Sequence, residues 1–224
     1  MRIVNPDSED YHVHTSTFSD GWNSVDEVVK YAGVLGLTKI ALTDHSQAGI
    51  DATGLGQKTF RAIVPRWKNV HNDVEVIFGV EGDLLNDSGD VCFDIQGIES
   101  AYSILAVHHN VYVGDPTKIT DAYLNAIQRH GDKIAFVAHL TAKKALVDHL
   151  DVSKVVRAAN DYGIPLELNG ADLAMNRSDP DVLRHMLNEA DAIYVNSDAH
   201  TLADLRDFRE LGFQYLREEG FLES

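Results

Sequence analysis

The stretch Asp10-Tyr11-His12-Val13-His14, followed at a short distance by Ser19-Asp20-Gly21, decides how the rest of the chain is interpreted. On a β-strand the side chains alternate between the two faces, so His12 and His14 point to the same side. Two imidazoles on one face of a strand are half of a metal site. We expect regular structure to begin at Asp10, because the residues before it show no strand or helix pattern.

A second pair with the same spacing lies near the other end of the chain. Asp198-Ala199-His200 follows the apolar run 192–195, and it again places two metal-binding side chains at positions i and i+2. If the chain closes into a barrel, its first and last strands become neighbours and the two pairs meet. The pairs therefore predict a barrel with a metal site where its ends join.

Between these pairs, apolar or β-branched runs alternate with helical patterns. The seven runs are 10–14, 39–43, 74–80, 103–108, 134–138, 165–168 and 192–196. Nearly continuous apolar strands that alternate with helices are typical of a parallel sheet covered by helices. The segment 46–72 is expected to be a long loop with one helix that ends near 68–72. No linker or repeat is visible, so a single α/β domain over residues 1–224 is expected.

Composition excludes several classes of protein. The 224 residues carry 35 acidic against 19 basic side chains, a formal net charge of −16, whereas a nucleic-acid surface needs a basic stripe. No apolar run is long enough for a transmembrane helix, and the N-terminus has no secretion signal. The single cysteine, Cys92, excludes an internal disulfide and fits a reducing compartment. We expect a cytoplasmic protein with a small substrate, no membrane contact and no preference for long nucleic acid; its oligomeric state stays open.

Most of the predicted strands end in a metal-binding residue type, and the C-terminal ends of barrel strands form the active face. Any one of these histidines alone is better explained as an ordinary core or surface residue, but together they predict a site. The nine candidates are His12, His14, Asp20, His45, Glu81, His108, His139, Asp198 and His200. Nine nitrogen and oxygen ligands are too many for one ion, and they suit two or three divalent ions of Zn, Mn or Fe.

Eight short motifs, in order along the chain, resemble those of the PHP (polymerase and histidinol phosphatase) family. They are Asp-Tyr-His12-Val-His14-Thr, Ser-Asp20-Gly, Leu-Thr-Asp-His45, Gly-Val-Glu81, Val-His108, Ala-His139, Leu-Glu167-Leu-Asn169 and Asn-Ser-Asp198-Ala-His200. The resemblance covers roughly 11–213. It implies a distorted (β/α)7 TIM-like barrel with a trinuclear metal centre that hydrolyses phosphoesters, most like the small stand-alone bacterial phosphatases of the family.

The resemblance also divides the nine residues among three ions. The sets are His12, His14, Glu81 and Asp198 for the first ion; Glu81, as a bridge, with His108 and His139 for the second; and Asp20, His45 and His200 for the third. Two positions depart from the family pattern: Leu140 follows His139 where proline is common, and Asp20 stands where some members carry histidine. His109, next to His108, is expected to point to the other face of its strand.

A metal-bound hydroxide would serve as the nucleophile, so no side-chain nucleophile is predicted and Cys92 is expected to be a core or loop residue. Phosphate groups usually meet a cationic side chain. The candidates for substrate binding are Arg177, after the sixth strand, and Lys143 or Lys144, after His139, although each is also explained as a solvated surface charge.

The expected function is hydrolysis of a small phosphomonoester. Three alternatives stay open: a nuclease or phosphodiesterase of the same family, a metal-dependent amidohydrolase-like enzyme, since His-x-His strands also serve that chemistry, and a domain kept for protein contacts. Trp22, close to Asp20, is expected to wall the pocket, whereas Trp67 is expected to pack against a helix.

Overall fold

The computed structural model describes residues 1–55, 58–142 and 147–223. Its strands are β1 (Arg2–Ile3), β2 (Glu9–Val13), β3 (Lys39–His45), β4 (Glu75–Leu84), β5 (Val91–Cys92), β6 (Asp94–Ile95), β7 (Ile98–Glu99), β8 (Ser103–Ala106), β9 (Ile134–Val137), β10 (Leu166–Asn169) and β11 (Ala192–Asn196). Its α-helices are α1 (Val25–Val34), α2 (Gln47–Thr53), α3 (Phe60–Ile63), α4 (Ile119–His130), α5 (Val152–Asp161), α6 (Gly170–Ala174), α7 (Pro180–Glu189) and α8 (Leu202–Glu218), with 3-10 helices η1 (Pro116–Lys118) and η2 (Val147–His149).

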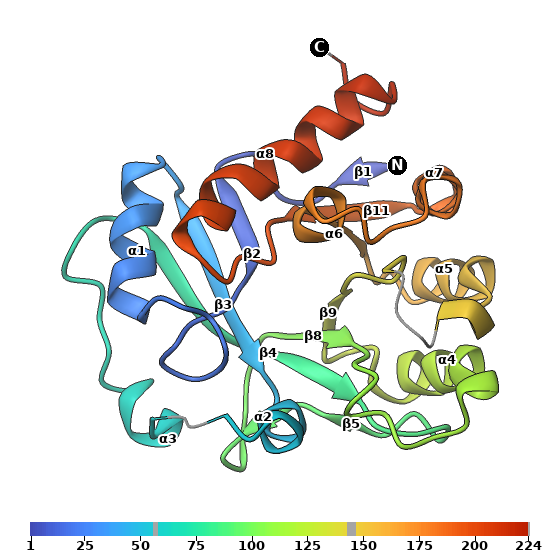
Figure 1. Cartoon of the computed structure of the whole chain (residues 1–224), viewed down its shortest axis with the longest axis horizontal. Coiled ribbons are helices and arrows are strands. Elements are labelled where there is room, and N and C mark those ends of the chain that lie inside the picture. Colours follow the sequence, from blue (N-terminus) through green and yellow to red (C-terminus); the bar gives the residue numbers. More distant parts are fainter. Residues whose placement is uncertain (56–57, 143–146, 224) are drawn as a thin grey trace.

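The main sheet is curled and follows the order β1-β11-β10-β9-β8-β4-β3-β2, and every pair along this path is parallel. All seven predicted strands are present, as β2, β3, β4, β8, β9, β10 and β11. Helices α1, α4, α5, α7 and α8 lie around the outside of the sheet (Figure 1). The prediction of a distorted (β/α)7 TIM-like barrel is therefore confirmed.

The two ends of the sheet meet between β2 and the segment that follows β11. The His14 amide donates to the Ala199 carbonyl at 2.9 Å, and the Ala199 amide donates to the His12 carbonyl at 3.3 Å. Lower down, the Tyr11 amide donates to the side chain of Asn196 at 3.0 Å instead of to a backbone carbonyl. The predicted meeting of the two His-containing pairs is thus present, but a side chain replaces part of the ladder and distorts the closure.

Regular structure begins earlier than expected, so the prediction that it starts at Asp10 is wrong. Strand β1 pairs with the first half of β11, with Arg2 opposite Ala192. The Asn5 side chain extends this pairing, because it donates to the Val195 carbonyl and accepts from the Val195 amide, both at 2.9 Å. A two-residue strand is too short to show the period of two by which strands are recognised.

The segment 46–72 holds two short helices, α2 and α3, so the prediction of one helix ending near 68–72 is wrong. Ser46 caps α2 by accepting from the Gly49 amide, and Gly54 ends it in the left-handed conformation with φ of 69°. The first side chain of α3, Phe60, packs edge-on against Phe18. Seven and four residues are too few for an amphipathic pattern to stand out from a loop.

The barrel interior below the predicted metal residues is apolar. Its buried members are Tyr11, Ala41, Ile104, Ala106, Phe136 and Ala138. The Phe136 ring lies 6.4 Å, centroid to centroid, from the ring of His12. This layer packs beneath His12. In the parts of the chain that the structure describes, no helix combines the length and apolar character needed to cross a membrane.

Candidate metal centre

The carboxylate of Glu81, on β4, lies at the centre of a histidine cluster and is only 1% exposed. Five imidazoles surround it: Oε1 faces His139 Nε2 at 2.8 Å, His12 Nε2 at 3.5 Å and His108 Nε2 at 3.7 Å, while Oε2 faces His45 Nδ1 at 2.8 Å and His14 Nε2 at 3.7 Å. No described lysine or arginine forms an ion pair with it. Each oxygen therefore faces its own set of imidazoles, as a bridging ligand requires.

Two further carboxylates complete the cluster on the side of the barrel closure. Asp20 Oδ1 lies 3.3 Å from His45 Nε2, 3.4 Å from His200 Nε2 and 3.8 Å from His14 Nδ1. Asp198 Oδ1 lies 3.4 Å from His14 Nε2 and 3.6 Å from both His12 Nε2 and His200 Nδ1. These contacts join all nine sequence-predicted candidates into one continuous cluster.

Within the cluster, three groups of residues place one nitrogen or oxygen each within 4.8 Å of one another. They are His14, Asp20, His45 and His200; His12, His14 and Glu81; and His45, Glu81 and His108. The groups overlap with the sets implied by the family resemblance but share residues differently. His14 belongs to two groups, and His45 joins Glu81 as well as Asp20. Such sharing brings the candidate ion positions close together.

The ring nitrogens that point away from the cluster are held by buried carboxylates. His12 Nδ1 lies 2.9 Å from Glu167 Oε1, on β10, and His108 Nδ1 lies 2.6 Å from Asp83 Oδ1, on β4. A hydrogen bond at one ring nitrogen fixes the ring orientation and the tautomer, so that the other nitrogen is free to bind a metal ion. In both rings this leaves Nε2 facing Glu81.

No role was predicted for Glu167 and Asp83 from the sequence, although each lies two residues from another polar residue on the same strand. Asp83 stands two residues after Glu81 on one strand and so shares its face, and Glu167 stands two residues before Asn169. Glu167 is 1% exposed and accepts four hydrogen bonds. Its donors are His12 Nδ1, the His139 amide, Asn169 Nδ2 and Asn196 Nδ2, at 2.9 to 3.0 Å.

A third buried carboxylate, Asp44, fixes the loop that carries Asp20. It accepts from the Thr15 amide at 2.7 Å, the Thr15 hydroxyl at 2.9 Å and the Ser19 hydroxyl at 2.5 Å. Burial raises the pKa of Asp44 to about 6, although these hydrogen bonds oppose the rise. Ser19 is thereby fixed one residue before Asp20, which positions the Asp20 carboxylate at the edge of the cluster.

The dense packing of imidazoles and carboxylates shifts their pKa values strongly. Burial would raise the pKa of Glu81, but His108 and His45 outweigh it and hold that pKa well below its usual range. Burial and the neighbouring His200 lower the pKa of His14 to about 4. For His200 burial is outweighed by Asp20 and Asp198, which raise its pKa to about 9. Imidazoles with a raised pKa, such as His200, are therefore protonated in the metal-free cluster, and a bound metal ion would displace those protons.

The cluster also has the properties expected of a site built for divalent ions. His45 Nδ1 and Glu81 Oε2 are buried and only 2.8 Å apart, yet neither has an aligned hydrogen-bond partner in the described structure. Asp198 and His139 adopt positive φ values of 53° and 33°, conformations that non-glycine residues rarely take and that concentrate at functional sites. Imidazole and carboxylate donors together suit Zn, Mn and Fe. The donor set fits the predicted ions.

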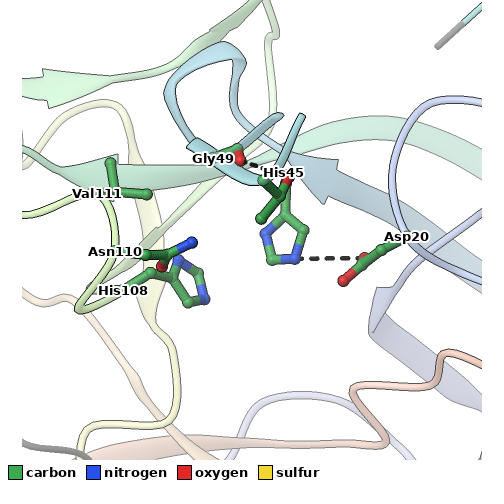
Figure 2. A pocket seen from close by; sticks show the side chains of 7 residues that line it. Asp20, His45, Gly49, His108, Asn110 and Val111 are labelled. Atoms are coloured by element: carbon green, nitrogen blue, oxygen red, sulfur yellow. Dashed lines mark hydrogen bonds and ion pairs between the residues drawn. The ribbon is translucent and has the colours of Figure 1, made fainter. Parts of the chain in front are cut away.

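A pocket of about 180 Å³ opens onto one side of the cluster (Figure 2). Asp20, His45 and His108 face into it, and the other lining residues are Gly49, Thr53, Asn110 and Val111. A Cβ atom at Gly49 would lie 3.0 Å from Asp83 Oδ2 and 3.3 Å from His45 Cβ, so a larger residue would crowd two members of the site. The pocket therefore connects the cluster with the protein surface.

The remaining candidates lie outside this cluster. His109 is exposed, whereas His108 faces Glu81. Arg177 is exposed and forms no ion pair with any described residue, and Lys143 and Lys144 lie outside the described residues. Cys92 is partly buried on β5, a strand, where a core or loop position was expected.

The two tryptophans differ in their surroundings. Trp67 packs against Phe78 with a ring separation of 5.3 Å and donates to Asp26 at 3.0 Å. Trp67 therefore packs against the core cluster that includes α1, in agreement with its expected packing against a helix. Trp22 is 82% exposed and does not line the pocket described above, so its predicted role as a pocket wall is not met.

Replacing Glu167 with glutamine is expected to weaken metal binding by about 10- to 100-fold, the usual effect of losing a partner that orients a metal ligand. All four groups that face this carboxylate are donors, so the amide nitrogen of Gln would oppose at least one of them. Competition with a coloured chelator measures the affinity. Glu210→Gln, on the exposed face of α8, is the matched control, and wild-type affinity in Glu167→Gln would contradict the orienting role.

Comparison with known proteins places this chain in a family. The PHP domain model matches residues 10–192, and the chain belongs to the PHP domain family. A protein of Shewanella baltica (strain OS195) named "Probable phosphatase" is 28% identical over 170 residues, which cover 75% of this chain and 64% of that protein. A "Probable phosphatase" of Acetivibrio thermocellus is 26% identical over 198 residues, covering 85% of this chain and 78% of that protein.

Among solved structures, the chain is similar to histidinol phosphate phosphatase of Lactococcus lactis, complexed with zinc, L-histidinol and phosphate. The TM-score is 0.57 at 16% identity, with 92% of each chain covered. This level of identity shows a shared fold. The match to the Shewanella relative spans 64% of that protein's length, so its activity does not transfer directly to this chain.

Proposed function

We propose that this protein is a metal-dependent phosphatase that hydrolyses a small phosphomonoester. The observation that carries the proposal is the environment of Glu81, a fully buried carboxylate faced by five imidazoles. Removing a carboxylate from water costs several kcal/mol unless charge or hydrogen bonds compensate. Imidazoles that converge on such a carboxylate, with no lysine or arginine of the described residues paired to it, are best explained by shared metal ions.

We assign the nine cluster residues as ligands of two or three divalent ions, with Glu81 as the bridge. When bound, such ions activate a water molecule at neutral pH and offset the negative charge of a phosphoryl group. Glu167 and Asp83 hold the rings of His12 and His108 in place, and Asp44 holds the loop of Asp20. The protein therefore supplies a preformed cluster in which little reorganisation is needed.

The family comparisons support a phosphoester as the substrate. Two relatives are named as phosphatases, and the Lactococcus protein of similar fold was solved with zinc, phosphate and a small alcohol. The pocket beside the cluster is small, and its lining includes Asn110, whose side-chain amide is suited to donate to phosphate oxygens. Arg177 stays a candidate for phosphate binding, since it is exposed and unpaired among the described residues.

Long nucleic acid is a poorer substrate for this chain. Its formal charge is −16, and binding a polyanion requires lysines and arginines that replace counterions along the strand. We therefore favour a small phosphomonoester over the nuclease, and over the amidohydrolase-like enzyme because the comparisons name phosphatases.

The expected result is a higher kcat/KM on at least one small phosphomonoester than on any oligonucleotide. The measurement compares a panel of phosphomonoesters with single- and double-stranded oligonucleotides at two salt concentrations. Cleavage of oligonucleotides that exceeds every monoester and falls steeply with salt would instead identify a nuclease. Release of carboxylate from amide substrates without phosphate release would identify the amidohydrolase alternative.

A further inference from the structure

Asn110, in the turn that follows β8, lines the pocket beside the metal centre, and its side chain points into that pocket (Figure 2). In the part of the chain that the structure describes, its side-chain amide has no hydrogen-bond partner. The hydroxyl of Thr53 is already used, because it donates to the carbonyl of Gly49 at 2.9 Å. The two lining histidines face Glu81 and Asp20. Among the described lining residues, Asn110 therefore carries the side-chain donor that is available to a substrate.

The turn that carries Asn110 is held firmly against the cluster. The carbonyl of His108 accepts from the amides of Val111 at 3.0 Å and Tyr112 at 2.9 Å. The hydroxyl of Tyr112 donates to Asp87, in the loop after β4, at 2.6 Å. Val111 and Tyr112 are buried, whereas Asn110 is exposed. The backbone of Asn110 is thus fixed two residues from a cluster histidine, while its side chain stays accessible.

The charge of the pocket gives such a donor a purpose. A phosphate usually meets a cationic side chain, but the described residues that line this pocket include no lysine or arginine. The ions assigned to the cluster would offset charge on the phosphoryl oxygens that face them. A terminal oxygen turned away from the cluster needs a donor from the protein. The amide of Asn110 offers two N–H groups and, unlike a carboxylate, does not repel the phosphate.

We propose that Asn110 is a specificity-determining residue that donates to a terminal phosphoryl oxygen and thereby favours phosphomonoesters over phosphodiesters. This inference rests on the proposed function and names a residue that sets the substrate class at the same site. A monoester has three terminal oxygens, whereas a diester carries an alkyl group on one of them. A diester with its two terminal oxygens at the cluster presents only an ester oxygen to Asn110. That oxygen carries no charge, and hydrogen bonds to charged acceptors are the stronger ones.

The kinetic test compares p-nitrophenyl phosphate with methyl p-nitrophenyl phosphate, which has the same leaving group but one terminal oxygen capped by a methyl group. A hydrogen bond to a charged group contributes a factor of about 10 to 100, so Asn110→Ala is expected to lower kcat/KM on the monoester at least about tenfold. On the diester the loss should stay below about threefold, as for a bond to a weak acceptor. Asn110→Asp should lose more on the monoester, and Asn110→Gln should keep part of the monoester preference.

Val113→Ala is the matched control for these variants. Val113 lies in the same loop, is 82% exposed and is not among the residues that line the pocket. This variant should keep the wild-type ratio of the two kcat/KM values. Equal losses on both esters in Asn110→Ala, or an unchanged ratio, would overturn the proposal.

A binding test does not depend on turnover. Inorganic phosphate, titrated into manganese-loaded protein in a calorimeter, should bind about tenfold more weakly to Asn110→Ala than to the wild type. Dimethyl phosphate, with only two terminal oxygens, should bind equally to both proteins. Phosphate binding that depends on Asn110 in a protein that hydrolyses no monoester would contradict the proposed function and support this inference. Hydrolysis of monoesters by Asn110→Ala with the wild-type preference would support the function and overturn the inference.

Discussion

Replacing Glu81 with glutamine is expected to lower kcat/KM by at least about a thousandfold, because metal-held charge stabilisation is worth several kcal/mol and each 1.36 kcal/mol is tenfold in rate. A carboxylate offers one oxygen to each of two ions, whereas an amide has one acceptor, carries no charge and turns a donor toward the imidazoles. His139 and His45, each 2.8 Å from a different oxygen of Glu81, lie on the two sides that would lose their shared ligand. Steady-state kinetics on the best phosphomonoester measures the loss.

Asp20→Asn is the matched comparison, because it also converts a carboxylate to an amide within the cluster. Asp20 lies at the exposed edge, with its side chain 36% exposed, and its ion pairs are with His14, His45 and His200. We expect this variant to keep the ions bound around Glu81 and to lose activity by only about 10- to 100-fold, as for weakened metal affinity. Elemental analysis of both variants counts the ions. Equal activity and equal metal content in the two variants would refute the bridging role of Glu81.

Removal of bound metal is expected to abolish phosphatase activity, and addition of Zn, Mn or Fe should restore it. The described residues that line the pocket include no serine or cysteine. The Ser19 hydroxyl lies 3.4 Å from His14 Nδ1 but donates to Asp44 at 2.5 Å, so we expect the nucleophile to depend on bound metal. Metal ions compete with protons for imidazole nitrogen, and the raised pKa values of His12, His45 and His200 make reloading release protons. The assay follows phosphate release by chelated, dialysed and reloaded protein.

The control for this experiment tests whether the chelated protein stays folded, because without the ions the buried carboxylates repel one another. Circular dichroism of the chelated protein distinguishes loss of the fold from loss of catalysis. Full turnover by protein shown to be metal-free would contradict the mechanism, whereas recovery with only one of the three metals would identify the preferred ion.

The barrel was predictable from the sequence because its seven main strands carry runs of apolar or β-branched residues that alternate with helical patterns. β3, for example, is Lys-Ile-Ala-Leu-Thr-Asp-His, and its five central residues are all buried. β1 was missed since only two residues pair, and Asn5 carries the rest of that contact through its side chain. The helices α2 and α3 were not separated because neither is long enough to show a period of 3.6 residues.

The nine cluster residues were predictable because strand ends bring them to one rim, and the pairs His12/His14 and Asp198/His200 show the period of two. The carboxylates that orient the cluster histidines could not be predicted, because in the sequence Glu167 and Asp83 resemble any other polar residue within a strand. Their role depends on which ring nitrogen they face, which is set by the curvature of the sheet. How the residues are shared between ions, as with His14, likewise depends on distances across the barrel.

The bridging role of Glu81 is tested most directly by the anomalous diffraction of a crystal grown without chelator and soaked with phosphate. We expect at least two metal peaks within bonding distance of Glu81, one beside each carboxylate oxygen, and phosphate density in the pocket lined by Asp20, His45 and His108. An ordered cluster with no anomalous peaks, in crystals of protein that hydrolyses phosphomonoesters, would contradict the bridging role.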